Sequence, residues 1–312
     1  MVALVSRISN VGVLSTSGIS GQGIFDEVSL AGANTTKRLN ANGIIQTSGI
    51  LDEVSIQGNT TTMREFSNGN LAVSGSFDEV TGPLVTNGLV LNVAMNKLES
   101  YTGGSTITDL TRTETTAGTL IGSPSYTTGN NGYLKFNGSS QYITFPGTSS
   151  LGLDAQSKTM TAWISPTSYP TSPVCLVDKE NGSTGWGFWI NSSGKLWYWP
   201  QANNDAIDNG ALSLTTNTWN HATIVWNNST NVASFYYNGA LSSSVNSSGG
   251  EVASLTTVPL YIAWWGRGGT GEYFAGNIGE IQLYNRTLSS GEILNNYNAG
   301  ASRYGLPYIG NL

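Results

Sequence analysis

The sequence has 312 residues but only one cysteine, Cys175, and one histidine, His221. A lone cysteine excludes an intramolecular disulfide and a metal site built from cysteines. The histidine stands in Trp-Asn-His-Ala, where we expect a structural role, so no general base remains to activate a Ser or Cys nucleophile. The sequence therefore excludes a cysteine protease, a serine hydrolase and a zinc finger.

Charge is also scarce, since Asp, Glu, Lys and Arg together make up 10% of the residues and the formal net charge is −6. Without a basic run, the chain is not expected to bind nucleic acid or an anionic membrane. No segment approaches the roughly 18 apolar residues of a membrane helix. The first residues lack the charged and apolar regions of a signal peptide, which predicts synthesis in a reducing cytosol.

Glycine is abundant, with 39 residues, and Ser, Thr and Asn are frequent. This balance is typical of all-β proteins, in which Gly and Asn supply the positive φ angles of tight turns. Nine Trp and fourteen Tyr can bury enough apolar surface to exclude disorder. The length allows two domains.

Residues 1–83 contain an internal repeat. Phe-Asp-Glu-Val-Ser at 25–29 recurs as Leu-Asp-Glu-Val-Ser at 51–55 and as Phe-Asp-Glu-Val-Thr at 77–81, with a spacing of 26 residues both times. Each copy contains two short β segments and is too small to bury an apolar face alone, so it must stack on other copies or on other chains. Thr-Gly-Pro at 81–83 marks the boundary with the rest of the chain.

Two arrangements of these repeats stay open. In the first, they form a stalk, anchor or trimerisation region, as in a homotrimeric fibre. In the second, they form a monomeric three-rung solenoid. The Asp-Glu pairs are interpreted as solvated turns rather than as calcium ligands.

Residues 274–300 predict a strand, a turn and a short helix. Gly279, Ile281 and Leu283 alternate with Glu280 and Gln282, which indicates a half-buried strand. Ser289 and Glu292 have the spacing of a capping box at a helix N-terminus. Gly300 is expected to end that helix in a left-handed conformation.

This segment resembles the closing segment of laminin-G-like jelly-roll domains, in the concanavalin-A-like superfamily. Further pieces match in order, namely Phe-Asn-Gly with Gln-Tyr-Ile at 136–143, Thr-Ala-Trp-Ile at 161–164, Trp-Asn-His-Ala at 219–222 and Tyr-Asn-Gly at 237–239. The resemblance implies an all-β fold, with a jelly-roll β-sandwich head over residues 84–312 preceded by the repeat-built region 1–83. Extracellular members commonly carry a disulfide, and this chain departs from them there. The resemblance also suggests calcium, without a ligand pattern that can be mapped onto this sequence.

An enzymatic function is not expected. Glucanases of this superfamily carry a Glu-x-Asp-x-x-Glu strand, whose carboxylates serve as nucleophile and acid. In this chain Glu280 is followed by Gln282 where the aspartate would stand. A glycan-cleaving enzyme remains a rival, with Glu280 and Asp178 as the carboxylates to test.

A binding function is better supported, because aromatic residues gather at 186–189, 197–199 and 261–265. On a strand, Trp197 and Trp199 share one face and Tyr198 takes the other. Exposed rings beside polar groups suit sugars, which stack on rings and hydrogen bond through their hydroxyls. The alternative, in which these rings fill the core and a trimer seam, stays open. The candidate ligand-binding residues are Trp264, Trp265, Arg267, Trp197, Trp199, Asp205 and Asp208.

These features favour a non-enzymatic structural protein of a phage-like virion, as a capsid decoration, spike or fibre assembled in the host cytoplasm. Residues 1–83 would contact other virion proteins and form a homotrimer, and the head would bind a host-surface glycan. The alternative is a bacterial surface or secreted carbohydrate-binding lectin.

Overall fold

The chain divides into two units, Met1–Pro83 and Leu84–Leu312. The computed structural model of the protein describes residues 84–309 except for 112–116, 129–131, 149–150, 152, 154, 181–183, 201–205, 248–257 and 267–271. In the first unit it describes six strands, β1 (Leu4–Val5), β2 (Gly12–Ser15), β3 (Gly18–Gln22), β4 (Val28–Ala31), β5 (Gln46–Ser48) and β6 (Val54–Gln57).

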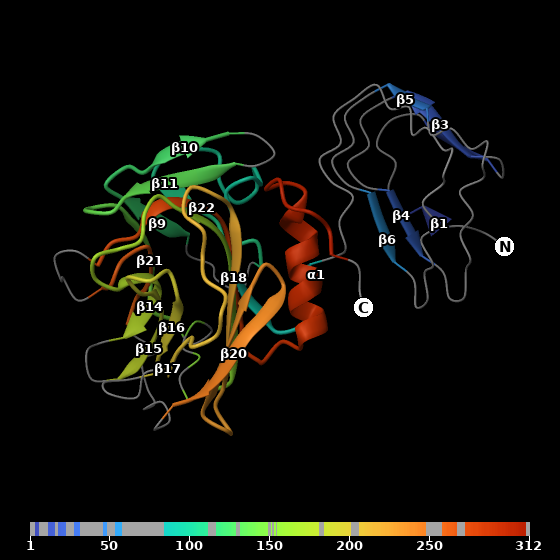
Figure 1. The fold of residues 1–312 in the computed structure, drawn as a ribbon. Helices are drawn as coiled ribbons and strands as arrows, with labels where there is room; N and C mark the ends of the chain where they lie inside the picture. The colour runs from blue at the N-terminus through green and yellow to red at the C-terminus, as the bar shows by residue number, and fades with distance from the viewer. Residues whose placement is uncertain are drawn as a thin grey trace. The chain divides into compact units, whose positions relative to one another are not determined.

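The strands of the first unit form two three-stranded sheets, β1-β4-β6 and β2-β3-β5 (Figure 1). The parallel pairs β4–β6 and β3–β5 follow the repeat, because Val28 pairs with Val54 and Ser20 pairs with Gln46. Residues in equivalent positions of the first two copies therefore lie side by side. The third copy at 77–81 lies outside the described residues, so the stalk, anchor or trimerisation role of residues 1–83 stays a prediction.

The second unit is a sandwich of two antiparallel sheets, which confirms the all-β jelly-roll prediction. The first sheet has the order β10-β11-β22-β13-β18-β19-β20, with β7 also paired to β22. Its strands are β7 (Leu89–Ala94), β10 (Ser125–Thr127), β11 (Tyr133–Asn137), β13 (Lys158–Pro166), β18 (Asn220–Asn227), β19 (Val232–Tyr237), β20 (Ala240–Asn246) and β22 (Ala275–Tyr284).

The second sheet has the order β17-β16-β15-β14-β21-β12-β9-β8. Its strands are β8 (Thr106–Ile107), β9 (Gly118–Ile121), β12 (Tyr142–Phe145), β14 (Val174–Glu180), β15 (Gly185–Ile190), β16 (Leu196–Trp199), β17 (Ala206–Ile207) and β21 (Leu260–Ile262). β11 and β12 follow each other in the chain but lie in different sheets, so the segment 136–143 is a crossing between layers rather than a paired hairpin.

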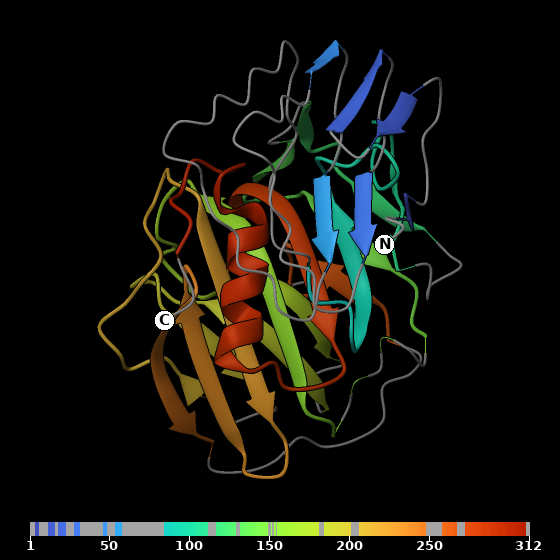
Figure 2. The ribbon, with the colours of Figure 1, turned by 90° about the vertical axis from the view of Figure 1, so that its right-hand side faces the viewer.

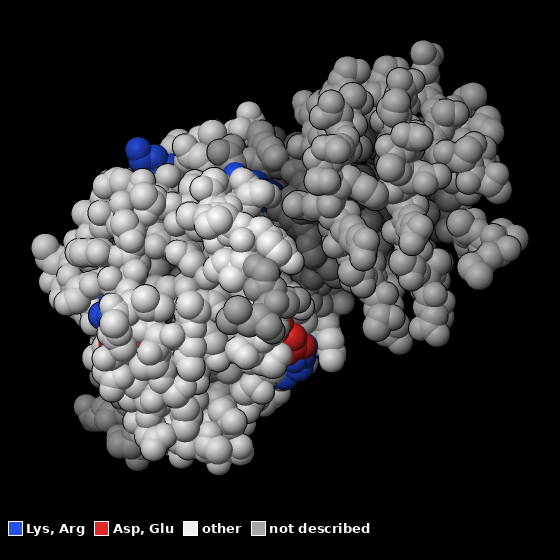
Figure 3. Space-filling view, turned by 45° about the vertical axis from the view of Figure 1, so that its right-hand side comes forward, with Lys and Arg blue, Asp and Glu red and all other residues white. Residues whose placement is uncertain are grey.

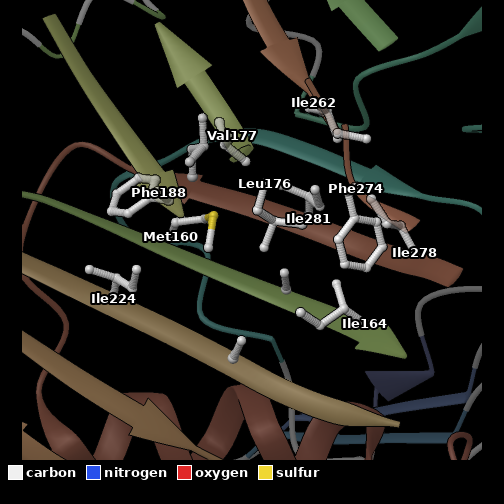
Figure 4. Close-up of a cluster of buried hydrophobic side chains, with 14 of the residues drawn as sticks. Met160, Ile164, Leu176, Val177, Phe188, Ile224, Ile262, Phe274, Ile278 and Ile281 are labelled. Atoms are coloured by element: carbon white, nitrogen blue, oxygen red, sulfur yellow. The ribbon is translucent and has the colours of Figure 1, made fainter. Parts of the chain in front are cut away.

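The core lies between the two sheets (Figure 4). Leu176, Val177, Phe188 and Ile262 of the second sheet face a set from the first sheet that comprises Met160, Ile164, Ile224, Ile278 and Ile281. Met160, Ala162 and Ile164 alternate along β13 and share its core-facing side. The hairpin β19–β20 turns at Asn238 and Gly239, whose φ angles of 50° and 79° are those of a two-residue hairpin turn.

One helix, α1 (Ser290–Ala301), lies across the outer face of the first sheet (Figure 2). The capping box is confirmed, because the Ser289 side chain accepts from the Glu292 amide and the Glu292 carboxylate accepts from the Ser289 amide.

Among the described residues, no helix is long and apolar enough to cross a lipid bilayer. On the face of the jelly roll in Figure 3, charged side chains are sparse.

The helix stop was predicted wrongly. Gly300 lies inside α1, and Ser302 caps the helix in a right-handed conformation. The glycine is needed for close packing instead, because a Cβ at this position would lie 2.4 Å from Nε1 of Trp163. Trp163 stacks on Tyr304 and Tyr297 at ring distances of 4.6 and 5.7 Å. Gly300 therefore lets the helix approach the sheet.

The half-buried strand was also predicted wrongly, since both faces of β22 are covered. Ile278, Ile281 and Leu283 point into the sandwich core. Glu280 and Gln282 face the other way but are buried as well. Glu280 pairs with Arg303 of the C-terminal segment, and Gln282 accepts a hydrogen bond from Thr161 at 2.6 Å. The alternation of residues along a strand does not show whether a segment later in the chain packs on its polar face.

Candidate functional site

The outer face of the second sheet carries most of the half-buried aromatic residues. In the strand register, Tyr261 of β21 pairs with Asp178 of β14, Asp178 pairs with Gly187 of β15, and Gly187 pairs with Trp199 of β16. Neighbouring residues in such a row point to the same side of the sheet. We call this surface the tryptophan face; its aromatic residues are Tyr142, Trp189, Trp197, Trp199, Tyr261, Trp264, Trp265 and Tyr273.

One group of rings on the tryptophan face surrounds Trp189. Its ring centroid lies 5.6 Å from Trp197, 6.2 Å from Trp199 and 5.8 Å from Trp265. Tyr198 points into the core instead, which confirms the predicted alternation. Trp197, Trp199 and Trp265 remain partly exposed, so they present aromatic surface that a ligand can cover.

The turn after β21 positions the tryptophan pair. Ala263 has a φ of 69°, a left-handed conformation that is uncommon for a residue with a side chain and that takes the chain out of the strand direction. Trp265 then donates its indole N–H to Glu180, and the backbone N–H of Gly266 donates to Asp178 at 3.2 Å. Both bonds join residues more than eighty positions apart in the chain and hold the turn over β14.

A second group of rings surrounds Trp264. Its ring lies 4.5 Å from Tyr142, 5.6 Å from Tyr273 in a stacked arrangement, and 5.2 Å from Tyr261. All four side chains are partly exposed. The adjacent residues Trp264 and Trp265 thus join the two groups of rings into one surface.

Three indole N–H groups on this face have no hydrogen-bond partner among the described residues, those of Trp189, Trp197 and Trp264. The Trp189 side chain is only 6% exposed, and its Nε1 lies over Gly187, where a Cβ would stand 2.2 Å away. Buried donors normally have an acceptor, and an indole N–H can only donate. These three N–H groups are enclosed by neighbouring atoms, so the surface that the face presents to a ligand is made of the aromatic rings themselves.

Carboxylates lie beneath the rings. Asp178 and Glu180 share one face of β14. Glu272 lies beside the start of the same strand, because its backbone carbonyl accepts a hydrogen bond from the Cys175 amide. Burial raises the pKa of the Cys175 thiol well above its usual value, and the negative charges of Asp178, Glu180 and Glu272 add to this effect. In the part of the chain that the structure describes, no three His, Cys, Asp or Glu side chains are arranged to hold a metal ion.

Asp208 lies away from the tryptophan face. Its buried carboxylate accepts from Tyr237 at 2.8 Å, Ser242 at 2.9 Å, Ser243 at 2.5 Å and the Gly210 amide at 2.9 Å. Burial by itself would raise the pKa of Asp208, but these hydrogen bonds outweigh it and lower the pKa. Through these hydrogen bonds Asp208 links the end of β17 to β19 and β20. Asp205 and Arg267 lie outside the described residues.

His221 has the structural position that its sequence context predicts. It pairs with Trp163 across β13 and β18 and packs between Trp163 and Tyr297 beneath α1, at ring distances of 5.0 and 5.9 Å. Neither imidazole nitrogen has a hydrogen-bond partner among the described residues, and burial lowers the pKa of the side chain from 6.5 to about 3.

The sequence interpretation missed several members of the face. Trp189 lies in the aromatic run 186–189, but the sequence does not indicate toward which face of the sheet its ring points. The ring of Tyr142 approaches Trp264 through the pairing of β12 with β21, and the ring of Tyr273 approaches it from the segment before β22. Asp178 and Glu180 do carry a local signal, because carboxylates two residues apart on a strand point the same way.

The jelly-roll region matches a family model described as the concanavalin A-like lectin/glucanases superfamily, over residues 137–294. That match covers just over half of the sequence. The chain belongs to this superfamily. The expected relation to laminin-G-like domains is thereby confirmed, and the matched region belongs to a lectin-like jelly-roll domain. No curated protein matches the chain.

Solved structures with the same fold include parts of toxins and of carbohydrate-active enzymes. Domain 4 of AbnA, a GH43 extracellular arabinanase from Geobacillus stearothermophilus in complex with arabinotriose, is 16% identical with a TM-score of 0.51, over 67% of this chain and 98% of that domain. The binding domain of Paraclostridial mosquitocidal protein 1 is 17% identical with a TM-score of 0.54, over 70% of this chain and 55% of the other. A Trypanosoma rangeli sialidase is 18% identical with a TM-score of 0.53, over 72% of this chain but 35% of the sialidase.

The expectation that this protein is not an enzyme is wrong in the light of these comparisons. It rested on the missing Glu-x-Asp-x-x-Glu strand, but the same fold occurs in a domain of an arabinanase and in a sialidase. The missing motif removes one catalytic arrangement, that of the glucanases. It does not remove every enzymatic use of the fold.

Proposed function

We propose that the jelly roll binds carbohydrate on the tryptophan face. The observation that carries this proposal is the joined surface of partly exposed rings around Trp189 and Trp264. Rings stack against the C–H face of a sugar while polar groups bond its hydroxyls. The arabinanase domain crystallised with arabinotriose and the toxin binding domains with this fold add support by analogy.

Replacing Trp265 by alanine tests this site. Trp265 is partly exposed, so we expect Trp265→Ala to fold and to lower retention on soluble polysaccharides in affinity electrophoresis by about tenfold, since a stacking contact contributes up to about 1.5 kcal/mol. Trp265→Phe keeps a ring but loses the N–H that donates to Glu180, and should retain intermediate binding. An unfolded Trp265→Ala protein, or one with undiminished retention, would contradict the assignment of Trp265 to the site.

We further propose that the whole chain is a structural component of a phage-like virion, as a decoration, spike or fibre, with residues 1–83 attaching it to other virion proteins as a homotrimer. Support comes from short β repeats placed before a lectin-like head and from the Gly-, Ser-, Thr- and Asn-rich composition. Mass spectrometry of purified virions should detect the chain. Its presence on the surface of uninfected bacteria instead would favour the alternative, a bacterial surface or secreted lectin.

A second candidate function is glycan cleavage, favoured by the placement of Asp178 and Glu180 on one face of β14 beneath Trp265. Carboxylates in this position can supply an acid and a base or nucleophile. Release of reducing sugar by the pure protein, lost in Asp178→Asn, would support it. Glu280→Gln is the matched control, because Glu280 lies under the C-terminal segment on the other sheet. No release from any bound glycan would reject this candidate.

A further inference from the structure

The arrangement of the tryptophan face contains information about the length of its ligand. The two groups of rings belong to different strands: the Trp264 group is built on β12 and β21, and the Trp189 group on β15 and β16. β14 lies between them. A ligand that stacks on both groups must therefore cross the strands rather than follow one of them.

The register gives the distance to be crossed. From Tyr261 to Trp199 the row passes through Asp178 and Gly187, which makes three steps between neighbouring strands. With a spacing of about 4.8 Å for each step, the two ends of this row lie about 14 Å apart. The repeat of a linear pyranose chain is about as long as one such step. One sugar ring therefore cannot contact both ends, whereas three or more linked rings can.

The middle of the row is suited to the interior of a chain. Gly187 has no side chain, and the Trp189 ring occupies the space above it with a buried N–H that has no acceptor among the described residues. The Trp189 ring therefore fills the middle of the row, between the partly exposed rings of Trp199 on β16 and of Trp264 after β21. An oligosaccharide can stack on both of these rings, whereas a terminal sugar can stack on the rings of one group only.

We propose that the tryptophan face recognises a linear oligosaccharide of at least three sugar rings laid across strands β21, β14, β15 and β16, rather than a single terminal sugar. This inference rests on the proposed carbohydrate-binding function and deepens it, because it defines the class of ligand as the internal part of a glycan chain. It also assigns two residues to the ends of the binding surface, where each contributes one stacking contact. One is Trp199 on β16, and the other is Tyr142 on β12, whose ring lies 6.1 Å from that of Tyr261.

The test measures affinity against chain length with the full chain of the protein. The probes are arrayed and soluble oligomers of glucose, xylose, arabinose and N-acetylglucosamine with one to six rings, together with the corresponding soluble polysaccharides. We expect binding to rise at least thirtyfold between one and four rings of the recognised series and to change little beyond. Binding of a monosaccharide as tight as that of the hexamer would overturn the inference while leaving carbohydrate binding intact. Absence of binding to every oligomer and polysaccharide would contradict the proposed function itself.

Variants at the two ends provide the second arm. Tyr142→Ala and Trp199→Ala should each lower the affinity for the six-ring oligomer about tenfold, and Tyr142→Phe and Trp199→Phe, which keep a ring, should restore most of it. Tyr308→Ala is the matched control, because Tyr308 is an exposed aromatic residue (64%) near the C-terminus and should leave binding unchanged. If only one end responds, or if both alanine variants fold and bind as the unaltered protein does, the ligand does not span the face.

Discussion

Replacing Asp208 by alanine is expected to lower the free energy of unfolding by about 3–4 kcal/mol while leaving glycan binding by the folded protein unchanged. The carboxylate is buried and accepts hydrogen bonds from three side chains and one backbone amide. Each buried donor left without its acceptor costs about 1–3 kcal/mol, and a bond to a charged acceptor is stronger than one to a neutral acceptor. The largest part of this loss is expected at Tyr237, because its buried hydroxyl would lose its acceptor while it still accepts a hydrogen bond from the Leu196 amide at 2.8 Å.

Urea denaturation followed by tryptophan fluorescence measures this effect. Asp208→Asn keeps the shape and one acceptor oxygen, so its loss should be smaller. Glu99→Ala removes an exposed carboxylate and should change the free energy of unfolding by no more than about 0.5 kcal/mol. If Asp208→Ala were as stable as the unaltered protein and had lost glycan binding, Asp208 would belong to the ligand site, as the sequence interpretation proposed.

Acid is expected to destabilise the jelly roll through His221. The side chain has a pKa of about 3 in the folded protein and 6.5 in its ordinary state, because burial disfavours the charged imidazolium. The unfolded chain therefore binds the proton more readily. The stability is complete above pH 6.5, falls as the pH drops below that value, and continues to fall until the pH reaches about 3. By pH 4 the single histidine accounts for a loss of about 3 kcal/mol, at 1.36 kcal/mol for each pKa unit.

The variant His221→Phe isolates this contribution. The imidazole contacts the rings of Trp163 and Tyr297 and makes no hydrogen bond to the described residues, so a phenyl ring can replace it without orphaning a polar group. The difference in unfolding free energy between pH 7 and pH 4 should shrink by about 3 kcal/mol in the variant. Other groups also titrate in this range, among them Glu292, whose pKa the Arg286 hydrogen bonds lower to about 2, but they are common to both proteins. Parallel pH profiles of the two proteins would refute the role of His221.

Features that depend on neighbours in the chain could be predicted from the sequence. The capping box of Ser289 and Glu292 is a contact over three residues, and the alternation of Trp197, Tyr198 and Trp199 needs only the period of a strand. The Asn-Gly turn of the β19–β20 hairpin is local in the same sense. The order of such pieces along the chain then sufficed to identify the superfamily.

Features that depend on distant contacts could not be predicted. Asp208 lies in a polar loop, but its acceptor role is fixed by Tyr237, Ser242 and Ser243, which are 29 to 35 residues away. Gly300 ends no helix, because Trp163 from another strand decides its environment. The same limit applies to the candidate site, where Trp265 reaches Glu180 across 85 residues and Trp189 turns over Gly187.

The central claim is that the tryptophan face is the ligand-binding surface of this jelly roll. The nine tryptophans of the chain give nine indole N–H signals in a nitrogen–proton correlation spectrum, which single Trp→Phe variants can assign. On titration with a recognised oligosaccharide, we expect the signals of Trp189, Trp197, Trp199, Trp264 and Trp265 to shift. Those of Trp163 and Trp226, buried elsewhere in the sandwich, should stay in place. Shifts confined to tryptophans outside the tryptophan face, with Trp264 and Trp265 unaffected, would contradict the claim.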